Sequence, residues 1–333
     1  MIGGHFYKLH PLPVFAYIRL QVKAERMNSV KDRPMNNSVI SEVTVAFLGT
    51  GLMGAPMSRN ILKKGYALRC WNRTDSKARP LEAHGAFVAQ TPQEAVAGAD
   101  VIISMLSDGP SVLGIMRKDM VLNALKKGAT WIDMSSTKPK EAHDQAEILS
   151  QKGIYHLDSP VSGGTKGAEA GSLAIMVGGD KDTFKAAFEL LSTMGRPVHV
   201  GPTGSGQLAK LANQTIVGIT IGAVAEAMYL LEKGGADPAA VRDALKGGFA
   251  DGTILQQHGA RMSARDFKPG GPSKIQLKDL NNVLEVAAQL NLKLPSTEHV
   301  RDRYAVLVND MDRGDVDHSG LFLELEEQNK KSS

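Results

Sequence analysis

An α/β N-terminal domain built on a parallel sheet, followed by an all-α C-terminal domain, is the fold class that the sequence predicts. Three observations support it. Short apolar runs rich in β-branched residues alternate with amphipathic stretches up to about residue 200, a glycine-rich loop separates the first run from the first helical pattern, and only helical patterns follow residue 204. A chain of 333 residues also exceeds what one compact core usually accommodates. We therefore expect two domains, at 42–203 and 204–333.

The first 41 residues differ from the rest of the chain. They contain six basic and two acidic residues and so carry its whole formal net charge of +4. The apolar segment 13–18 is too short to span a bilayer, and no small-residue cleavage site follows it. Serine is too scarce for a typical mitochondrial transit peptide. We predict that residues 1–41 are a disordered basic extension, or that an upstream start codon precedes a true start at Met27 or Met35.

The overall composition excludes several functional classes. Apolar residues make up 42% and charged residues 22% of the chain, which is typical of a soluble globular protein. Cys70 is the single cysteine, so neither an internal disulfide nor a cysteine-based zinc site is expected. The 39 Lys and Arg residues nearly balance the 35 Asp and Glu residues, unlike the composition of a nucleic-acid binder. We expect a cytoplasmic protein with no resident metal and no nucleic-acid or membrane partner.

The first strand, loop and helix form a pattern typical of dinucleotide binding. Residues 43–48 are a short apolar run, and Gly49-Thr50-Gly51-Leu52-Met53-Gly54 follows it directly. A helical pattern then runs from Pro56 to a stop at Lys63-Lys64-Gly65. In this setting the GxGxxG spacing predicts a Rossmann-type nucleotide site, whereas the bare pattern carries little weight. The alternative is a glycine-rich turn that binds no ligand.

Each glycine of the loop has a separate physical task. Gly49 permits the tight turn, Gly51 allows the backbone to approach a pyrophosphate, and Gly54 lets the helix pack closely on the strand. The pyrophosphate is then expected on the backbone N–H groups at the helix N-terminus, beside Leu52 and Met53.

The end of the second predicted strand, 67–71, indicates which dinucleotide is bound. NAD enzymes usually place Asp or Glu here to bind the ribose hydroxyls, whereas this chain has Asn72-Arg73-Thr74. Arg73 can pair with the 2′-phosphate of NADP, and Asn72 and Thr74 can add neutral hydrogen bonds. The alternative is that Arg73 is a solvated loop residue and Asp75 binds the ribose. We expect NADP(H) as the favoured cofactor, with NAD(H) as the alternative.

Further strands extend the predicted sheet. Apolar runs at 101–106 and 130–133 are typical of buried parallel strands, and ligands bind at the carboxyl ends of such strands. Met105 and Leu106, followed by Ser107, and the segment Ser135-Ser136-Thr137 are therefore expected to line the cofactor cleft. Later strands are expected at 155–157, 174–177 and 198–200.

The C-terminal half follows the turn-rich segment 201–206 and consists of predicted helices. The longest, 207–233, is apolar almost all round, and such a helix is expected to be buried on all sides. A membrane span is the alternative, but the apolar run breaks at Glu226 and falls short of the required length. A partner subunit commonly covers so apolar a helix, so we expect a homodimer or homotetramer. Further helices are predicted at 238–246, 277–289 and 296–312.

Three polar residues interrupt the apolar helix near its start. Lys210 precedes Asn213 by three positions and Gln214 by four, which places all three side chains on one helix face. A lysine in apolar surroundings is costly unless it is partnered, and burial lowers its pKa toward the range useful for proton transfer. The alternative is a lysine that extends to solvent at a helix end.

A second polar segment follows the predicted strand at 155–157. Its sequence is Asp158-Ser159-Pro160-Val161-Ser162-Gly163-Gly164. Ser162 with the N–H groups of Gly163 and Gly164 makes a compact anion site suited to a carboxylate. The alternative is an ordinary glycine-rich loop.

The remaining histidines and acidic residues do not form a recognisable site. His156, His199, His299 and His318 show no metal-ligand spacing and are expected to be structural. The segment Asp315-Val316-Asp317-His318 is weakly metal-like, but we discount it because it lies in a polar loop near the C-terminus.

Four motifs, in this order along the chain, are similar to those of the β-hydroxyacid dehydrogenase family. They are residues 47–57, residues 158–164, residues 206–214, and Phe267-Lys268-Pro269 with Leu277-Lys278-Asp279-Leu280. The resemblance extends over about residues 43–325. The family includes 3-hydroxyisobutyrate dehydrogenase, tartronate semialdehyde reductase and the glyoxylate/succinic semialdehyde reductases.

The resemblance implies a role for each matching residue. Lys210 matches the catalytic lysine, which Asn213 and Gln214 assist. Ser162-Gly163-Gly164 matches the loop that binds the substrate carboxylate, while Thr137 and Lys278 match positions that contact the cofactor. The implied activity is the NAD(P)-dependent interconversion of a short 3-hydroxy acid and its semialdehyde.

Two features resemble different branches of the family. Asn213-Gln214 stands where many members have Asn-Asn, and it resembles the tartronate semialdehyde reductases, as do Lys246-Gly247-Gly248-Phe249 and Asp317-His318-Ser319. Asn72-Arg73-Thr74 instead resembles the NADPH-dependent glyoxylate/succinic semialdehyde reductases. We expect reduction of tartronate semialdehyde (2-hydroxy-3-oxopropionate) to glycerate, with the other family activities as alternatives. Imine reductases lack the family lysine, and a non-catalytic dinucleotide-binding scaffold would have no reason to keep Lys210.

Overall fold

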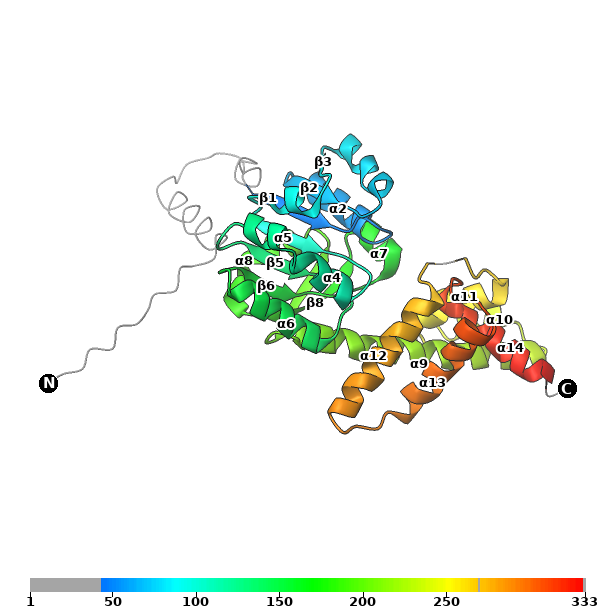
Figure 1. The fold of residues 1–333 in the computed structure, drawn as a ribbon. Coiled ribbons are helices and arrows are strands. Elements are labelled where there is room, and N and C mark those ends of the chain that lie inside the picture. Colours follow the sequence, from blue (N-terminus) through cyan, green and yellow to red (C-terminus); the bar gives the residue numbers. More distant parts are fainter. Residues whose placement is uncertain (1–42, 269, 332–333) are drawn as a thin grey trace, which may run out of the picture. The chain divides into compact units, whose positions relative to one another are not determined.

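The structure, a computed structural model, describes residues 43–268 and 270–331 (Figure 1). The expected basic extension 1–41 and Pro269 of the Phe267-Lys268-Pro269 motif lie outside the described residues. The chain forms two compact units that meet in sequence between Gln207 and Leu208. The N-terminal one is unit 1 and the C-terminal one is unit 2.

The described part of unit 1 contains one sheet of nine strands. They are β1 (Thr44–Leu48), β2 (Ala67–Trp71), β3 (Phe87–Val88), β4 (Val101–Ser104), β5 (Thr130–Asp133), β6 (Tyr155–Asp158), β7 (Val161–Ser162), β8 (Leu173–Gly179) and β9 (Gly195–Gly201). The first six run parallel in the order β3-β2-β1-β4-β5-β6, which is the strand order of dinucleotide-binding domains. β8 pairs antiparallel with β6 and β7 and parallel with β9. The predicted α/β class is confirmed.

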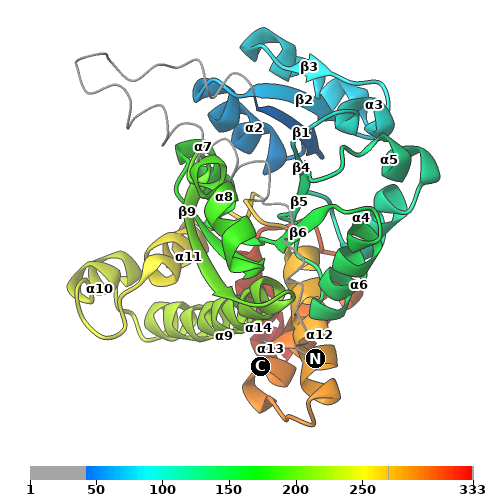
Figure 2. The same ribbon diagram turned by 90° about the vertical axis from the view of Figure 1, so that its left-hand side faces the viewer.

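Helices cover both faces of this sheet. They are α2 (Gly54–Lys63), α3 (Pro92–Val96), α4 (Gly109–Met116), α5 (Asp119–Ala124), α6 (Pro139–Ser150), α7 (Gly164–Ala170) and α8 (Lys181–Leu191). Successive strand residues point to opposite faces, so Val45 and Phe47 of β1 join one buried cluster while Ala46 and Leu48 join another. α2, α7 and α8 pack on the first face and α3 to α6 on the second, as Figure 2 shows.

Three details of unit 1 differ from the sequence prediction. β4 ends at Ser104 rather than at Leu106, so Met105 and Leu106 belong to the loop beyond the strand. β3 and β7 have two residues each, too few for any periodicity in the sequence to reveal them. The predicted glycine-rich loop is a strand, a turn and a helix, because β7 ends at Ser162 and α7 begins at Gly164.

Unit 2 is helical, which confirms the all-α prediction. Its helices are most of α9 (Ser205–Lys233), α10 (Pro238–Ala244), α11 (Thr253–Ala264), α12 (Ser273–Gln289), α13 (Pro295–Ala305), a π-helical turn (Val306–Asp310), a 3₁₀ turn (His318–Gly320) and α14 (Leu321–Lys331). The sequence predicts neither α11 nor α14. α12 begins at Ser273 rather than at Leu277, and the helix predicted at 296–312 divides into α13 and the π-helical turn.

The prediction that α9 is buried on all sides is wrong for the single chain. Ile221, Ala225 and Met228 are fully buried in the helical core, whereas Ile216 and Leu230 are 65% and 72% exposed. One face of the helix therefore packs within its own unit and part of its apolar surface stays uncovered. By length and composition alone α9 could also cross a membrane. A helix with its inner face in a hydrophobic core is, however, common in soluble proteins.

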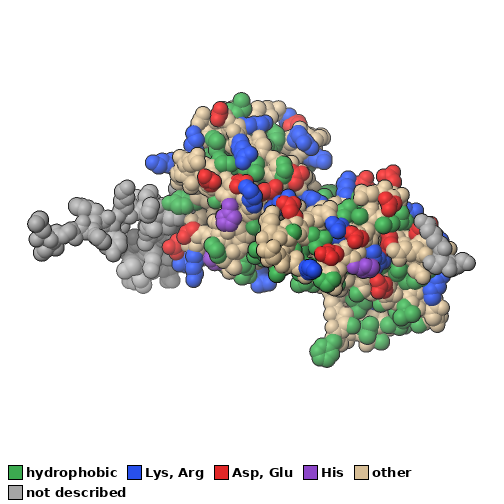
Figure 3. All heavy atoms as spheres, turned by 60° about the horizontal axis from the view of Figure 1, so that its bottom comes forward, with side chains coloured by type: hydrophobic (Ala, Val, Ile, Leu, Met, Phe, Trp, Pro, Cys, Tyr) green, Lys and Arg blue, Asp and Glu red, His purple; other side chains and the backbone are tan. Residues whose placement is uncertain are grey.

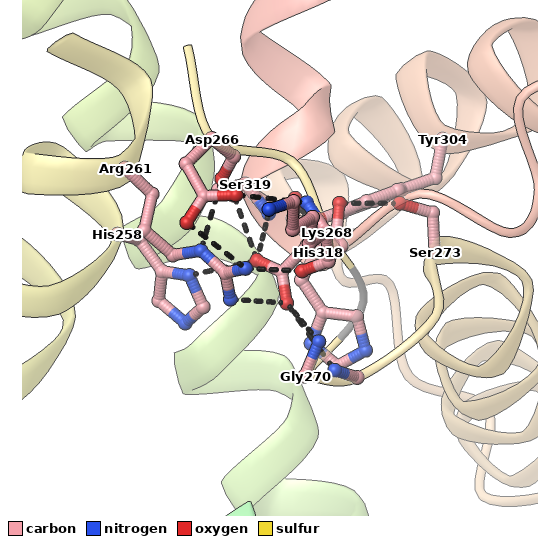
Figure 4. Close-up of polar contacts among 11 residues, drawn as sticks. His258, Arg261, Asp266, Lys268, Gly270, Ser273, Tyr304, His318 and Ser319 are labelled. Carbon is pink, nitrogen blue, oxygen red and sulfur yellow. Dashed lines mark hydrogen bonds and ion pairs between the residues drawn. The ribbon is translucent and has the colours of Figure 1, made fainter. Parts of the chain in front are cut away.

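Asp317 joins separate segments of unit 2. Its side chain is 2% exposed, with Oδ2 lying 2.9 Å from Arg261 Nη1 and Oδ1 lying 3.3 Å from His258 Nδ1. Oδ2 also accepts the Gly270 N–H, and Oδ1 accepts the N–H and hydroxyl of Ser319. Figure 4 shows these groups converging from α11, from the loop before α12 and from the segment before α14. Burial alone would raise the pKa of Asp317, but the contacts with His258, Ser319 and Gly270 outweigh it and lower that pKa well below its usual range.

Charges of both signs are interspersed on the surface drawn in Figure 3. Basic and acidic side chains alternate there with polar and hydrophobic ones, in keeping with the near balance of 39 basic and 35 acidic residues in the sequence.

Candidate functional site

The glycine-rich loop at the carboxyl end of β1 has the shape of a pyrophosphate cradle. A Cβ on Gly49, whose φ is +103°, would lie 2.3 Å from the Met105 carbonyl oxygen, and one on Gly54 would lie 1.9 Å from the Gly49 carbonyl oxygen. Around a Cβ on Gly51, by contrast, no described residue beyond its chain neighbours lies within 4 Å. Any side chain at Gly49 or Gly54 would therefore clash with the protein's own backbone. The open space over Gly51 suits a ligand that approaches the backbone.

The residues that follow in this loop also suit an anion. Leu52 and Met53 lie directly before α2, and the first turn of α2 contains no acidic residue that would oppose a phosphate. The Thr50 hydroxyl is buried and has no hydrogen-bond partner among the described residues. The loop therefore fits the dinucleotide that the sequence predicts.

The segment after β2 is tied to the glycine loop through Asn72. Asn72 Oδ1 accepts the Thr50 N–H at 3.0 Å, and its Nδ2 donates to the Thr74 carbonyl oxygen at 2.9 Å. Asn72 thus shapes the loop in addition to any contact with a ligand. Arg73 is exposed, whereas Asp75 forms an ion pair with Arg79 at 2.7 Å.

The carboxyl ends of β4 and β5 bring the other predicted cofactor residues together. Met105 donates its N–H to the Leu48 carbonyl oxygen at 2.8 Å, and Leu106 donates its N–H to Ser135 Oγ at 2.9 Å. Thr137 is 1% exposed, and its hydroxyl has no hydrogen-bond partner among the described residues. The predicted cofactor residues of unit 1 therefore form one connected edge of the sheet, as expected for a doubly wound fold.

A buried network of polar side chains lies next to the carboxyl ends of β4 and β5. Asp133 is fully buried and accepts hydrogen bonds from Ser104 Oγ, Gln145 Nε2 and the Ser135 N–H. Burial raises the pKa of Asp133, although these hydrogen bonds oppose the shift. His156 lies 3.0 Å from Gln145 Oε1 within the same network, and burial lowers its pKa to about 3. The expectation that His156 is structural agrees with this position.

Ser162 ends β7, Gly163 forms the turn after it, and Gly164 is the first residue of α7. Ser162 pairs with Ala174 of β8, and Gly163 has a φ of +139°, a conformation that favours glycine. The first N–H groups of α7 have no partner within the helix and follow this turn directly. The segment can therefore offer N–H donors and a hydroxyl to a carboxylate.

In unit 2, two of the three predicted catalytic residues, Lys210 and Asn213, both contact the third, Gln214. Gln214 Oε1 accepts hydrogen bonds from Lys210 Nζ at 3.1 Å and from Asn213 Nδ2 at 2.8 Å. Burial lowers the pKa of Lys210, the charge of Asp279 opposes this shift, and the charge of Lys278 adds to it. Lys210 is thus a partly buried amino group that donates to an amide oxygen and, among the described residues, forms no direct ion pair.

Sequence reasoning missed Asp279 and Gln276 as members of this cluster. Gln214 Nε2 donates to Asp279 Oδ2 at 2.7 Å and to Gln276 Oε1 at 3.1 Å. A carboxylate only accepts hydrogen bonds, so Asp279 forces the NH₂ group of Gln214 toward itself and the oxygen toward Lys210. Both residues lie more than 60 positions beyond Gln214 in the sequence, with separations of 62 and 65. Only the packing of α12 on α9 brings them together.

Lys278, the predicted cofactor lysine, lies on the same part of α12. Its Nζ is 3.1 Å from Asp279 Oδ1, and its side chain is 28% exposed. His318 is also electrostatically coupled to Lys210 and Asp279, and burial lowers its pKa to about 4. The predicted site residues are therefore divided between the units: the glycine loop, the other cofactor residues of the sheet edge and the Ser162-Gly163-Gly164 segment belong to unit 1, and the Lys210 cluster with Lys278 belongs to unit 2.

Two family models match the chain, and they meet at residue 204. Residues 44–204 match the NAD binding domain of 6-phosphogluconate dehydrogenase. Residues 204–324 match the family described as NAD-binding of NADP-dependent 3-hydroxyisobutyrate dehydrogenase.

Individual relatives span nearly the whole described chain. A 2-hydroxy-3-oxopropionate reductase of Escherichia coli is 38% identical over 284 residues, which are 85% of this chain and 97% of that protein. A probable 3-hydroxyisobutyrate dehydrogenase of Mycobacterium bovis is 35% identical over 84% of this chain and 96% of its own length. A solved structure of Mycobacterium tuberculosis 3-hydroxyisobutyrate dehydrogenase with L-serine has a TM-score of 0.78 and 34% identity, and covers 85% of this chain and 99% of that one. The chain therefore belongs to the 3-hydroxyisobutyrate dehydrogenase-like family of β-hydroxyacid dehydrogenases, which are NAD(P)-dependent oxidoreductases.

Proposed function

We propose that this enzyme reduces tartronate semialdehyde to glycerate and uses NADP(H) for the reaction. The observation that carries the proposal is the cluster in which Gln214 holds Lys210 while Asp279 holds Gln214. The long glutamine side chain spans the lysine and the carboxylate, and the Asn213-Gln214 pair resembles the tartronate semialdehyde reductases. The 38% identity to the 2-hydroxy-3-oxopropionate reductase of Escherichia coli supports the same substrate.

Lys210 is proposed to move the proton. The nicotinamide, when bound, supplies the hydride for reduction or accepts it in oxidation. As the aldehyde is reduced, Lys210 Nζ donates a proton to the carbonyl oxygen and its positive charge stabilises the developing alkoxide. Gln214 Oε1 holds Nζ in place, since the orientation of this amide is set by Asp279. Asn213 donates to the same oxygen and so helps to hold the Gln214 amide in this orientation.

Ser162-Gly163-Gly164 is proposed to bind the carboxylate of the substrate. The glycine turn and the first N–H groups of α7 provide donors without the bulk of side chains. Fixing the carboxylate restricts the orientation of the neighbouring carbonyl group, which raises the rate by holding the reacting atoms near attack geometry. Lys278 is proposed to contact the cofactor.

The test of this function is a comparison of substrates. Tartronate semialdehyde, methylmalonate semialdehyde, succinate semialdehyde and glyoxylate are each offered with NADPH and with NADH, and the loss of reduced-nicotinamide absorbance gives kcat/KM. The highest kcat/KM is expected for tartronate semialdehyde. A preference for methylmalonate semialdehyde would instead favour 3-hydroxyisobutyrate dehydrogenase activity, which the 35% identity to the Mycobacterium bovis protein also suggests. A preference for glyoxylate or succinate semialdehyde would favour glyoxylate/succinic semialdehyde reductase activity, which Asn72-Arg73-Thr74 indicates, over the activity that Asn213-Gln214 indicates.

Arg73 is proposed to select NADP(H) over NAD(H). A charge-assisted hydrogen bond to the 2′-phosphate contributes about 1.5–3 kcal/mol, so Arg73→Ala should raise the KM for NADPH by about 10- to 100-fold. The KM for NADH should stay nearly unchanged, because NADH lacks the phosphate. Arg196→Ala is the control, since Arg196 is an exposed arginine of the same unit that lies on β9, away from the loop after β2 and from Asp75. Equal effects of Arg73→Ala on both cofactors would contradict the assignment.

The exposed apolar part of α9 is proposed to bind a second copy of the chain, giving a homodimer or homotetramer. Ile216 and Leu230 are large apolar residues at 65% and 72% exposure on one helix. Light scattering on the eluting protein should give at least twice the mass of the 35.6 kDa chain, and Ile216→Glu should shift the mass toward one chain. A wild-type mass of one chain would refute this proposal.

We further propose that the enzyme is cytoplasmic. Fractionation of cells that express the full chain tests this, and recovery of the protein with membranes or organelles would count against it.

A further inference from the structure

Gln207 is a fully buried polar residue in the first turn of α9, and its side chain binds the segment that follows β5. Its Oε1 accepts the Thr137 N–H at 2.9 Å, and its Nε2 donates to the Ser135 carbonyl oxygen at 2.9 Å. One amide group therefore holds two backbone positions of the loop at 135–137. The loop is separated from Gln207 by about 70 residues in the sequence, with separations of 70 and 72.

The backbone of Gln207 is held equally firmly. Its N–H donates to Asp158 Oδ2 at 2.9 Å, while the Gly204 N–H donates to Asp158 Oδ1 at 2.9 Å. A Cβ on Gly206 would lie 2.3 Å from the Asp158 carbonyl oxygen and 2.6 Å from that of Met176, so the start of α9 lies directly against β6 and β8. The Gln207 side chain thus reaches the loop from an anchored position.

The loop that Gln207 holds lies where the fold binds its ligand. Ser135 and Thr137 follow the carboxyl end of β5, and ligands of doubly wound sheets bind at the carboxyl ends of the strands. Leu106, which follows β4, donates its N–H to Ser135 Oγ at 2.9 Å. The buried Thr137 hydroxyl has no hydrogen-bond partner in the described part of the chain. A displacement of residues 135–137 would therefore displace this edge of the cofactor site.

We propose that Gln207 is a positioning residue for hydride transfer, which holds the 135–137 loop in the place where it orients the nicotinamide. The inference rests on the proposed nicotinamide-dependent function and extends it to a residue that touches no reacting atom. Lys210 stands three positions later in the same helix, but Gln207 acts through the cofactor loop. The competing explanation is that Gln207 only stabilises unit 1.

Gln207→Met separates these two explanations. Methionine has a similar length and volume but leaves the Thr137 N–H and the Ser135 carbonyl without their partner. The control is Thr183→Val, which removes one buried hydroxyl hydrogen bond, to Asp180, in α8 of the same unit. Both variants should lower the melting temperature, so stability alone does not distinguish them.

Three measurements on the full-length variants distinguish them. For Gln207→Met we expect kcat to fall by about tenfold or more and calorimetry to show weaker binding of NADPH. The primary deuterium isotope effect on kcat, measured with 4-deuterated NADPH, should rise, because hydride transfer becomes slower relative to product release. Thr183→Val should leave all three at their wild-type values. If Gln207→Met lowers only the melting temperature and keeps the wild-type Kd, kcat and isotope effect, the residue is structural and the proposal is overturned.

Gln207→Glu provides a rescue that a purely structural role would not produce. A protonated carboxyl group can accept from Thr137 and donate to Ser135 as the amide does, whereas a carboxylate would face the Ser135 carbonyl oxygen without a proton. The titratable groups near this position are Asp158 on β6, Asp133 on β5 and His143 of α6, which lies beside Gly204. Relative to wild type, kcat of Gln207→Glu should recover as the pH falls, and kcat of Gln207→Met should not. Parallel profiles for the two variants would contradict the hydrogen-bonding role.

Failure of the inference can be told apart from failure of the proposed function. If the wild-type enzyme turns over none of the four aldehydes, the proposed substrate is wrong, yet the NADPH Kd of Gln207→Met still tests the positioning role. If the wild-type enzyme is active and Gln207→Met is equally active with the same Kd, only the inference fails.

Discussion

Lys210→Ala should lower kcat by about 10²- to 10⁴-fold, the usual contribution of a positioned proton donor. The variant loses both the proton that reaches the carbonyl oxygen and the positive charge that stabilises the alkoxide. The Kd for NADPH should remain close to the wild-type value, because the predicted cofactor loop belongs to unit 1. Steady-state kinetics with tartronate semialdehyde and calorimetry with NADPH measure the two effects.

Lys233→Ala is the matched control for this substitution. Lys233 is the last residue of the same helix, where its Nζ lies over the Tyr229 ring at 5.3 Å, remote in sequence from the polar cluster. Its removal should leave kcat unchanged. If Lys210→Ala retained more than about a tenth of the wild-type kcat, Lys210 would not be the proton donor.

The pH dependence of the wild-type enzyme should reflect the same group. Reduction requires the protonated form of Lys210, so kcat for reduction should fall as the pH rises through its pKa. Oxidation requires the neutral form, so kcat for oxidation should rise through the same pKa. Because burial lowers the pKa of Lys210, both changes should occur below the value of about 10.4 for an exposed lysine.

Asp317→Asn should destabilise the protein by about 3–5 kcal/mol, the usual cost of breaking a buried ion pair. The substitution removes the charge that pairs with Arg261 and places an NH₂ group among N–H donors. The loop that leads into α12 and the segment that leads into α14 lose their shared anchor. Urea unfolding of both proteins, followed by circular dichroism, measures the difference.

Asp315→Asn is the control, two positions away. Asp315 is 87% exposed and pairs with Lys274 at the surface, where an ion pair contributes about 0–1 kcal/mol. The pH provides a second check. Since the pKa of Asp317 is lowered in the folded protein, its stabilising effect is complete above the unfolded value of about 3.9 and is lost as the pH falls below it. A difference between wild type and Asp317→Asn that is negligible at neutral pH would contradict this role.

Local patterns in the sequence account for much of the fold. These patterns are the β-branched runs, the GxGxxG spacing and the glycines that end helices. They are informative because backbone sterics and hydrophobic periodicity act within a few residues. The strands of the parallel sheet and the all-α second half were therefore predictable. Two-residue strands such as β3 and β7 have no period of their own and were not.

The burial of α9 shows where local patterns are insufficient. Its composition predicts an apolar surface but not which part of that surface the rest of the chain covers. The structure buries Ile221 and Met228 while Ile216 and Leu230 remain exposed. An apolar pattern on every face of a helix therefore predicts that the helix is covered, but it does not show whether the same chain or another subunit covers each face.

The fold class, the glycine-rich loop and the shared helix face of Lys210, Asn213 and Gln214 could all be predicted from the sequence, because each depends on residue spacing along the chain. The contact of Asp279 with the Gln214 amide and that of Gln207 with the loop at 135–137 could not be predicted in this way. These hydrogen bonds join residues separated by 65 to 72 positions. A buried polar side chain needs a partner, but only the packing of distant elements decides which group that partner is.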